Sequence, residues 1–217
     1  MNGINHIVFD MDGTLFDTSE GILDCYIHVA KSMDRDIPSQ SSLYKLIGGP
    51  LRTNLKNLYG LDGSECSLAV DLYRTHYSEI GLEKSVAYPK VQSTIKHLYE
   101  NGYDLSVATL KRQDFAVEFI KKNGLTPYFR AVNGMDLNDT LSKEALIRNC
   151  IRDCNSSERT TLVIGDSESD LNGAAKNNAH FLAATWGFGF NEPFCLENGI
   201  QYVSQFEDII DHLEIDP

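Results

Sequence analysis

Long apolar runs, cysteine and positive charge are all scarce in this sequence. No segment approaches the ~18 uninterrupted apolar residues that a membrane span requires, and the opening MNGINHIVF lacks the basic and apolar regions of a secretion signal. We therefore expect a cytoplasmic protein. The five cysteines are odd in number and scattered, which argues against a disulfide framework in a chain of 217 residues.

Basic residues are outnumbered, with 19 Lys and Arg against 31 Asp and Glu and a formal net charge of −12. Nucleic acids and anionic membranes bind basic surfaces, so we expect neither as a partner. A small anionic substrate is compatible with this charge if a cation and a few local basic groups reverse the potential inside one pocket. The sequence leaves the oligomeric state open between a monomer and a small homo-oligomer.

Short, continuous apolar runs recur at residues 6–9, 104–109, 161–165 and 180–184, with helical patterns between them. Continuous rather than alternating apolarity is typical of strands covered on both faces, and intervening helices indicate crossovers between parallel strands. The pattern predicts an α/β fold with a doubly wound parallel sheet.

The first two runs are separated by about ninety residues, far more than an ordinary crossover uses. Within that gap the apolar positions recur at helical spacing. The sequence thus predicts an α/β core of residues 1–17 and 86–217, interrupted by a small all-helical domain of residues 18–85.

Carboxylates crowd the segment FDMDGTLFDT at residues 9–18, directly after the first run. Carboxylates a few ångströms apart repel by about 1 kcal/mol per pair in water and more when partly buried, so a bound cation is expected. Asp166 follows the third run and Thr109 ends the second. Because the carboxyl ends of parallel strands meet at one edge of a sheet, these polar strand ends should face one crevice.

Several nearby positions have open interpretations. Asp17, with Glu20 three residues later, is predicted to be the N-cap of the following helix. Asp170 either joins a metal site or braces its loop, and Ser167 and Ser169 are alternative helix caps. The stretch WGFGF at residues 186–190 either lines the edge of the pocket or packs as a loop.

Four motifs in order resemble those of the haloacid dehalogenase-like (HAD) phosphatases: DxDGT at residues 10–14, Thr109, Lys143 in LSKEALI, and GDSESD at residues 165–170. The resemblance covers the whole chain and implies a Rossmann-like core with a helical cap of the C1 type. The cap segment IGGPL at residues 47–51 is similar to that of the phosphoglycolate-phosphatase-like subgroup.

The resemblance implies a Mg²⁺-dependent phosphoric monoester hydrolase. Asp10 would be the nucleophile that forms an aspartyl-phosphate, and Asp12 the general acid and base. Mg²⁺ would be held by Asp10, the main-chain carbonyl of Asp12 and Asp166, with Asp170 in the same network. Thr109 would donate its hydroxyl and Lys143 its charge. The expected substrate contacts are Gly13, Thr14, Leu110, Gly49 and Arg52.

The motifs leave several alternatives open. Thr14 either contacts the phosphate or only stabilises the turn. Lys111 is an alternative to Lys143 as the cation beside the nucleophile and the phosphate. The substrate could be phosphoglycolate-like, a pyrophosphate, a nucleotide or a sugar phosphate. A phosphomutase of the β-phosphoglucomutase type shares all four motifs. A metal-independent haloacid dehalogenase is a second alternative, although such enzymes normally lack an acid at the position of Asp12. A non-enzymatic phospho-binding module is a third.

Overall fold

The computed structural model describes residues 3–214, and their contacts divide the chain into two compact units. One unit comprises Met1–Phe16 and Ala87–Pro217, and the other comprises Asp17–Val86. The first is an α/β unit and the second is helical. No helix of the described part is long and apolar enough to cross a membrane.

The α/β unit is built on a six-stranded sheet in the order β5-β4-β1-β6-β7-β8. Its recorded strand pairs are parallel. This confirms the predicted fold class. The strands are β1 (His6–Phe9), β4 (Asp104–Arg112), β5 (Ala131–Met135), β6 (Thr161–Gly165), β7 (His180–Ala184) and β8 (Tyr202–Val203).

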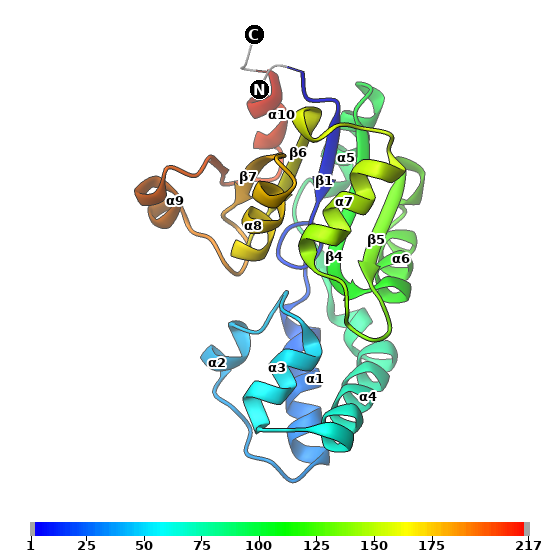
Figure 1. Ribbon diagram of the computed structural model, residues 1–217, viewed down its shortest axis with the longest axis vertical. Helices are drawn as coiled ribbons and strands as arrows, with labels where there is room; N and C mark the ends of the chain where they lie inside the picture. Colours follow the sequence, from blue (N-terminus) through cyan, green and yellow to red (C-terminus); the bar gives the residue numbers. More distant parts are fainter. Residues whose placement is uncertain (1–2, 215–217) are drawn as a thin grey trace. The chain divides into compact units, whose positions relative to one another are not determined.

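Helices follow most of these strands and cover the sheet. Figure 1 shows α7 and α8 on the near face of the sheet and α5 behind it. The helices of this unit are α5 (Val91–Glu100), α6 (Gln113–Lys122), α7 (Lys143–Asp153), α8 (Glu168–Lys176), α9 (Glu192–Asn198) and α10 (Asp208–Glu214), with short 3₁₀ turns η2 (Thr126–Tyr128) and η3 (Glu158–Thr160).

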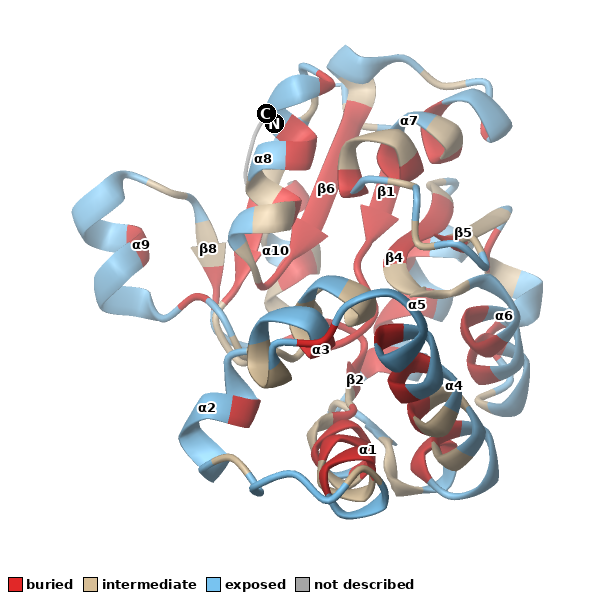
Figure 2. Ribbon diagram, turned by 60° about the horizontal axis from the view of Figure 1, so that its bottom comes forward, coloured by how far each residue is buried: buried red, intermediate tan, exposed pale blue. Residues whose placement is uncertain are grey.

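The central strand β1 is buried on both faces, as its continuous apolarity predicts. Val8 packs with residues of α7 and α8, including Leu146 and Ala174. Its neighbour Phe9 points to the opposite face, where its ring stacks on Phe206 at a centroid distance of 5.8 Å. In Figure 2 β1 and β6 are buried along their lengths.

The helical unit contains α1 (Ser19–Ser32), α2 (Gln40–Tyr44), α3 (Leu51–Tyr59), α4 (Gly63–Glu79) and the 3₁₀ turn η1 (Gly81–Lys84). Its core includes Tyr26, whose ring lies edge-on to Tyr73 of α4 at 5.1 Å. Two short strands, β2 (Phe16–Asp17) and β3 (Val86–Ala87), form a separate two-stranded sheet where the chain leaves and re-enters the α/β unit.

The helix start predicted at Asp17 is wrong by one residue. Thr18 is the N-cap of α1, and its side chain makes no capping hydrogen bond. The carboxylate of Asp17 instead accepts hydrogen bonds from the backbone N–H of Ser19 at 3.0 Å and from its hydroxyl at 2.6 Å. The Asp17 carboxylate therefore binds the start of the helix from the residue that precedes the N-cap. Asp17 itself still belongs to the strand β2.

Candidate active site

Asp10 and Asp166 come together because their strands are neighbours. β1 pairs with β6 so that Phe9 is opposite Ile164, and the backbone N–H of Asp10 donates to the Ile164 carbonyl at 2.9 Å. Each aspartate thus stands at the carboxyl end of a central strand. This is the edge where parallel α/β sheets bind ligands.

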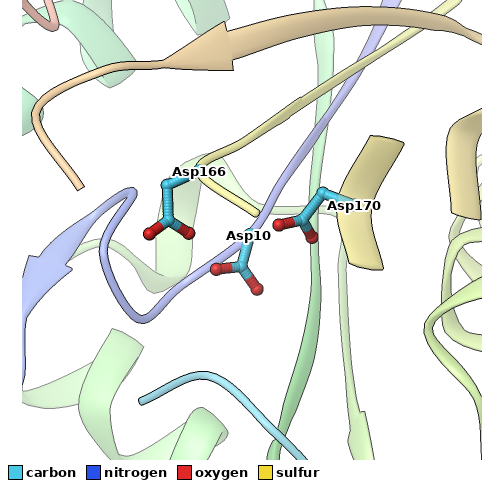
Figure 3. Close-up of side chains that lie close together, drawn as sticks. All are labelled: Asp10, Asp166 and Asp170. Atoms are coloured by element: carbon cyan, nitrogen blue, oxygen red, sulfur yellow. The ribbon is translucent and has the colours of Figure 1, made fainter. Parts of the chain in front are cut away.

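Asp170, in the first turn of α8, completes a cluster of three buried carboxylates (Figure 3). One carboxylate oxygen from each of Asp10, Asp166 and Asp170 lies within 4.8 Å of the others. The three residues are only 6%, 3% and 1% exposed. Such a group repels itself strongly unless protons or a cation are present.

The ionisation of these carboxyl groups reflects that repulsion. Burial raises the pKa of Asp10 well above its ordinary value; Lys143 opposes the rise, while the charges of Asp170, Asp166 and Asp12 add to it. Burial and then the charge of Asp170 raise the pKa of Asp166 to about 7. Burial and mutual repulsion thus disfavour the ionised form of these carboxyl groups. A hard divalent cation such as Mg²⁺ prefers oxygen ligands, and its charge would favour their ionised form.

Lys143 supplies a positive charge to the same cluster from the first position of α7. Ser142 caps that helix, because its hydroxyl accepts from the backbone N–H of Ala145. The Lys143 Nζ forms an ion pair with Asp10, lies 2.8 Å from Asp170 Oδ1, and donates to the Ala108 carbonyl at 2.9 Å. Burial by itself lowers the pKa of Lys143, but the carboxylates of Asp10 and Asp170 outweigh it and raise the pKa.

Asp12 has a different cationic partner from Asp10. The Nζ of Lys111 lies 2.9 Å from Asp12 Oδ1, and both side chains are 6% exposed. Lys111 and Lys143 are alternatives for one charged role in the prediction from the motifs, whereas in the structure each lysine pairs with its own aspartate. The two carboxylates of the DxD motif are therefore neutralised from two separate segments of the chain.

The turn after Asp12 depends on Gly13, which has a φ of +88°. A Cβ at this position would lie 2.3 Å from Asp166 Oδ2, so only glycine lets the turn approach that carboxylate. Thr14 is fully buried, and within the described residues its hydroxyl has no hydrogen-bond partner. An unpartnered buried hydroxyl favours contact with a bound group over a purely structural role.

The prediction that the second strand ends on Thr109 is wrong. β4 continues to Arg112, which pairs with Met135 after a register irregularity between Ala108 and Arg112. Thr109 is 1% exposed, and its Oγ1 accepts from the backbone N–H of Lys111 at 3.1 Å. Leu110 packs its side chain against the core cluster that contains Val8.

Asp170 combines both interpretations that the sequence leaves open. One of its oxygens, Oδ2, accepts from the backbone N–H and the hydroxyl of Ser167, which is the N-cap of α8. Its other oxygen, Oδ1, faces Lys143. Asp170 therefore braces its loop and also belongs to the carboxylate cluster.

Gly49 and Arg52 lie in the helical unit. Arg52 is in the first turn of α3, and its Nη1 donates to the Ser67 hydroxyl at 3.4 Å. A Cβ at Gly49 would lie 2.9 Å from the side-chain nitrogen of Asn54, which itself donates to the Leu46 carbonyl. The substrate contacts expected from both residues stay predictions.

The segment at residues 186–190 makes contacts that its sequence does not predict. The indole N–H of Trp186 donates to the Thr14 carbonyl at 3.0 Å, and the backbone N–H of Phe188 donates to Asp166 Oδ2 at 2.6 Å. In the sequence, the alternation of glycine and aromatic residues after β7 could have indicated a close approach of this loop to another segment, because glycines permit close backbone contacts. Nothing local in the sequence identifies the two partners.

The model of the family described as "Haloacid dehalogenase-like hydrolase" matches residues 7–184, which include all four motifs. The chain belongs to this family. The resemblance stated from the motifs is thereby confirmed.

Two curated relatives and a solved structure support the same assignment for this HAD-like hydrolase. It is 30% identical over 210 residues to a protein of Pseudomonas aeruginosa named 5'-nucleotidase, with 96% of this chain and 95% of that protein covered. It is 27% identical to a phosphoglycolate phosphatase of Mesorhizobium japonicum, with 84% and 83% covered. A crystal structure of a predicted phosphatase from Clostridium acetobutylicum matches with a TM-score of 0.89 at 30% identity, with 97% of this chain and 98% of that chain covered.

Proposed function

We propose that this HAD-like hydrolase is a Mg²⁺-dependent phosphatase that hydrolyses a small phosphate monoester through an aspartyl-phosphate on Asp10. One observation carries the proposal: Asp10 ends the central strand β1, is buried with Asp166 and Asp170 within 4.8 Å, and forms an ion pair with Lys143. A carboxylate so placed is a nucleophile with positive charge available beside it.

The carboxylates of Asp10 and Asp166, with the main-chain carbonyl of Asp12, would hold Mg²⁺, and Asp170 would belong to the same network. The bound ion supplies charge that neutralises the phosphoryl oxygens. Lys143 orients the nucleophile, because its ammonium contacts Asp10, Asp170 and the carbonyl of Ala108, the residue before Thr109. The backbone of the Gly13 turn and the hydroxyl of Thr109 would bind the phosphate.

In the first step an oxygen of Asp10 attacks phosphorus, and the bond from phosphorus to the leaving oxygen breaks. Asp12 protonates that oxygen, so an alcohol leaves. In the second step a water attacks phosphorus and gives a proton to Asp12, while the bond between phosphorus and the Asp10 oxygen breaks. This restores the Asp10 carboxylate and the protonated Asp12 and releases inorganic phosphate. General acid and base catalysis of this kind contributes roughly 10²–10⁴-fold to the rate.

The substrate class is proposed from the relatives. One is named a 5'-nucleotidase and another a phosphoglycolate phosphatase, and both names denote enzymes of small phosphate monoesters. We therefore propose a nucleoside monophosphate or a small phosphorylated acid as the first substrates to test. Arg52 and Gly49 of the helical unit are proposed to contact the leaving group, and Arg52→Ala should raise KM for anionic leaving groups alone.

A panel of phosphate esters assayed with and without Mg²⁺ tests the proposal. We expect turnover only with the ion, and loss of turnover in Asp10→Asn. Asp17→Asn is the matched control, because it makes the same carboxylate-to-amide change in the same segment at a residue that binds the start of α1. Full turnover by Asp10→Asn would refute the nucleophile.

The same panel separates the alternative functions. Conversion of one sugar phosphate to its isomer, without release of phosphate, would identify a mutase. Release of chloride from 2-chloropropionate in the presence of a chelator would identify a dehalogenase, although Asp12 argues against it. Phosphate binding with no turnover across the panel would identify a binding module.

A further inference from the structure

The loop of residues 186–190, here called the Trp186 loop, makes hydrogen bonds to two separate parts of the site. The indole N–H of Trp186 donates to the Thr14 carbonyl at 3.0 Å. The backbone N–H of Phe188 donates to Asp166 Oδ2 at 2.6 Å, and that of Phe190 donates to the Asp166 carbonyl at 2.7 Å. One short loop therefore holds both the turn that follows Asp10 and the carboxylate of Asp166.

Glycines make this close approach possible. A Cβ at Gly187 would lie 2.3 Å from Asp166 Cβ and 2.4 Å from the Gly13 carbonyl oxygen. A Cβ at Gly189 would lie 2.5 Å from the Asp166 carbonyl oxygen. The backbone of the loop is thus in direct contact with both segments, and no side chain fits between them.

Aromatic rings pack around the indole of Trp186. Its ring centroid lies 5.7 Å from that of Phe206 and 6.4 Å from that of Tyr88. Phe206 stacks in turn on Phe9, the residue before Asp10. The backbone N–H of Tyr88 donates to the Leu15 carbonyl at 3.1 Å, next to the carbonyl that Trp186 binds. Rings thus pack on two sides of the indole, whereas its anchor to the Gly13 turn is the hydrogen bond to the Thr14 carbonyl.

We propose that Trp186 is a positioning residue of the carboxylate site. Its N–H fixes the Thr14 carbonyl and so sets the Gly13 turn against Asp166. The backbone N–H groups of Phe188 and Gly189, in the same loop, orient the Asp166 carboxylate for a cation. Groups that hold ligands in this way commonly contribute 10–100-fold to metal affinity. The identity of the cation rests on the proposed function.

Two variants test the N–H separately from the ring. Trp186→Phe keeps an aromatic ring and removes the donor. Trp186 is the only tryptophan of the sequence, so biosynthetic replacement of tryptophan by 3-benzothienylalanine acts at this position alone. Sulfur then stands in place of the indole N–H, which removes the donor and keeps a bicyclic ring of nearly the same shape. Phe206→Leu is the control, because it removes a ring that packs on Trp186 while leaving the N–H in place.

The first measurement is hydrogen exchange of metal-free protein over residues 11–16. We expect faster exchange in Trp186→Phe and in the benzothienyl protein than in the wild type, because the backbone of this turn loses an anchor. The second measurement is Mg²⁺ affinity by calorimetry. We expect about tenfold weaker binding in both donor-deficient proteins, and a change of less than twofold in Phe206→Leu despite its lower thermal stability.

Equal exchange over residues 11–16 in the wild type and the benzothienyl protein would overturn the inference, whatever the chain hydrolyses. A parallel loss of Mg²⁺ affinity in Phe206→Leu and the donor-deficient proteins would also overturn it, because the ring alone would then account for the effect. Failure of the wild type to bind Mg²⁺ would overturn the proposed function together with the metal part of this inference.

Discussion

The Nζ of Lys111 lies 2.9 Å from Oδ1 of Asp12, ninety-nine positions earlier in the chain, and both side chains are almost fully buried. The residues come from β4 and from the turn after β1, two strands that are neighbours in the sheet. Asp12 is the proposed general acid, so this ion pair would orient the carboxyl group that donates the proton. This pair leads to the first prediction.

Lys111→Met should slow phosphoryl transfer from poor leaving groups more than from good ones. An alkyl phosphate needs a proton from Asp12, whereas p-nitrophenolate leaves without one. We expect kcat/KM to fall about 10–100-fold for the alkyl phosphate and less than about threefold for p-nitrophenyl phosphate. The ratio kcat/KM reports only the steps through phosphoryl transfer and so excludes the later attack by water.

The control for Lys111 is Lys121→Met, at an exposed position of α6. Equal losses for the two substrates in Lys111→Met would contradict a role in positioning the acid. Thermal unfolding should accompany the assay, since removing one partner of a buried ion pair costs about 3–5 kcal/mol.

Lys143→Met should lower kcat by at least about 10²-fold and yet strengthen binding of Mg²⁺. The variant loses the cation that orients Asp10. It also removes the ammonium that pairs with Asp10 and Asp170, so the carboxylate cluster attracts a divalent ion more strongly. The rise in melting temperature on adding Mg²⁺ should be larger than in the wild type. Lys176→Met, whose ammonium is exposed and 3.7 Å from Glu144, should change neither quantity.

Gly13→Ala should impair both stability and the metal site, because the new Cβ meets Asp166 Oδ2 at 2.3 Å and the residue has a φ of +88°. Gly102→Ala isolates the backbone effect, since Gly102 has a φ of +87° and nothing within 4 Å of the added atom. We expect each variant to lose about 1–2 kcal/mol of unfolding free energy from φ alone. Only Gly13→Ala should lose Mg²⁺-dependent activity; equal activity in the two variants would contradict this prediction.

His6 should make the protein less stable in mild acid. It is fully buried between the hydroxyls of Thr161 and Ser106. Burial lowers its pKa from 6.5 to about 4; the charge of Asp104 opposes this shift, and that of Arg130 adds to it. Between those two values the unfolded chain binds the proton and the folded chain does not. This contribution is therefore intact above pH 6.5 and is lost as pH falls towards 4, by about 3 kcal/mol in total.

Urea unfolding at several pH values between 4.5 and 8 checks the effect of His6. His6→Asn should flatten the profile in that window, although it lowers stability at pH 8. His97→Asn removes an exposed histidine of α5 and should leave the slope unchanged. A slope shared by the wild type and His6→Asn would show that other groups cause the acid sensitivity.

The sequence predicted some strands of the sheet and missed β5. The runs that became β1, β6 and β7 are continuous and apolar, and a buried central strand requires that pattern. The strand β5 was not predicted because Asn133 and Gly134 interrupt its apolar run. Tertiary contacts explain both residues: the Asn133 amide donates to Cys150 Sγ and Asp153, and a Cβ at Gly134 would lie 2.7 Å from the Lys111 carbonyl.

The sequence alone determined the family, the parallel sheet and the set of acidic strand ends, because strand order and the carboxyl-edge rule bring such residues together wherever this fold forms. Only the tertiary structure decided which lysine pairs with which aspartate and what the Trp186 loop binds. Trp186 and Thr14 are 172 positions apart. Contacts at such separation depend on how the strands and loops pack, and no local periodicity in the chain records them.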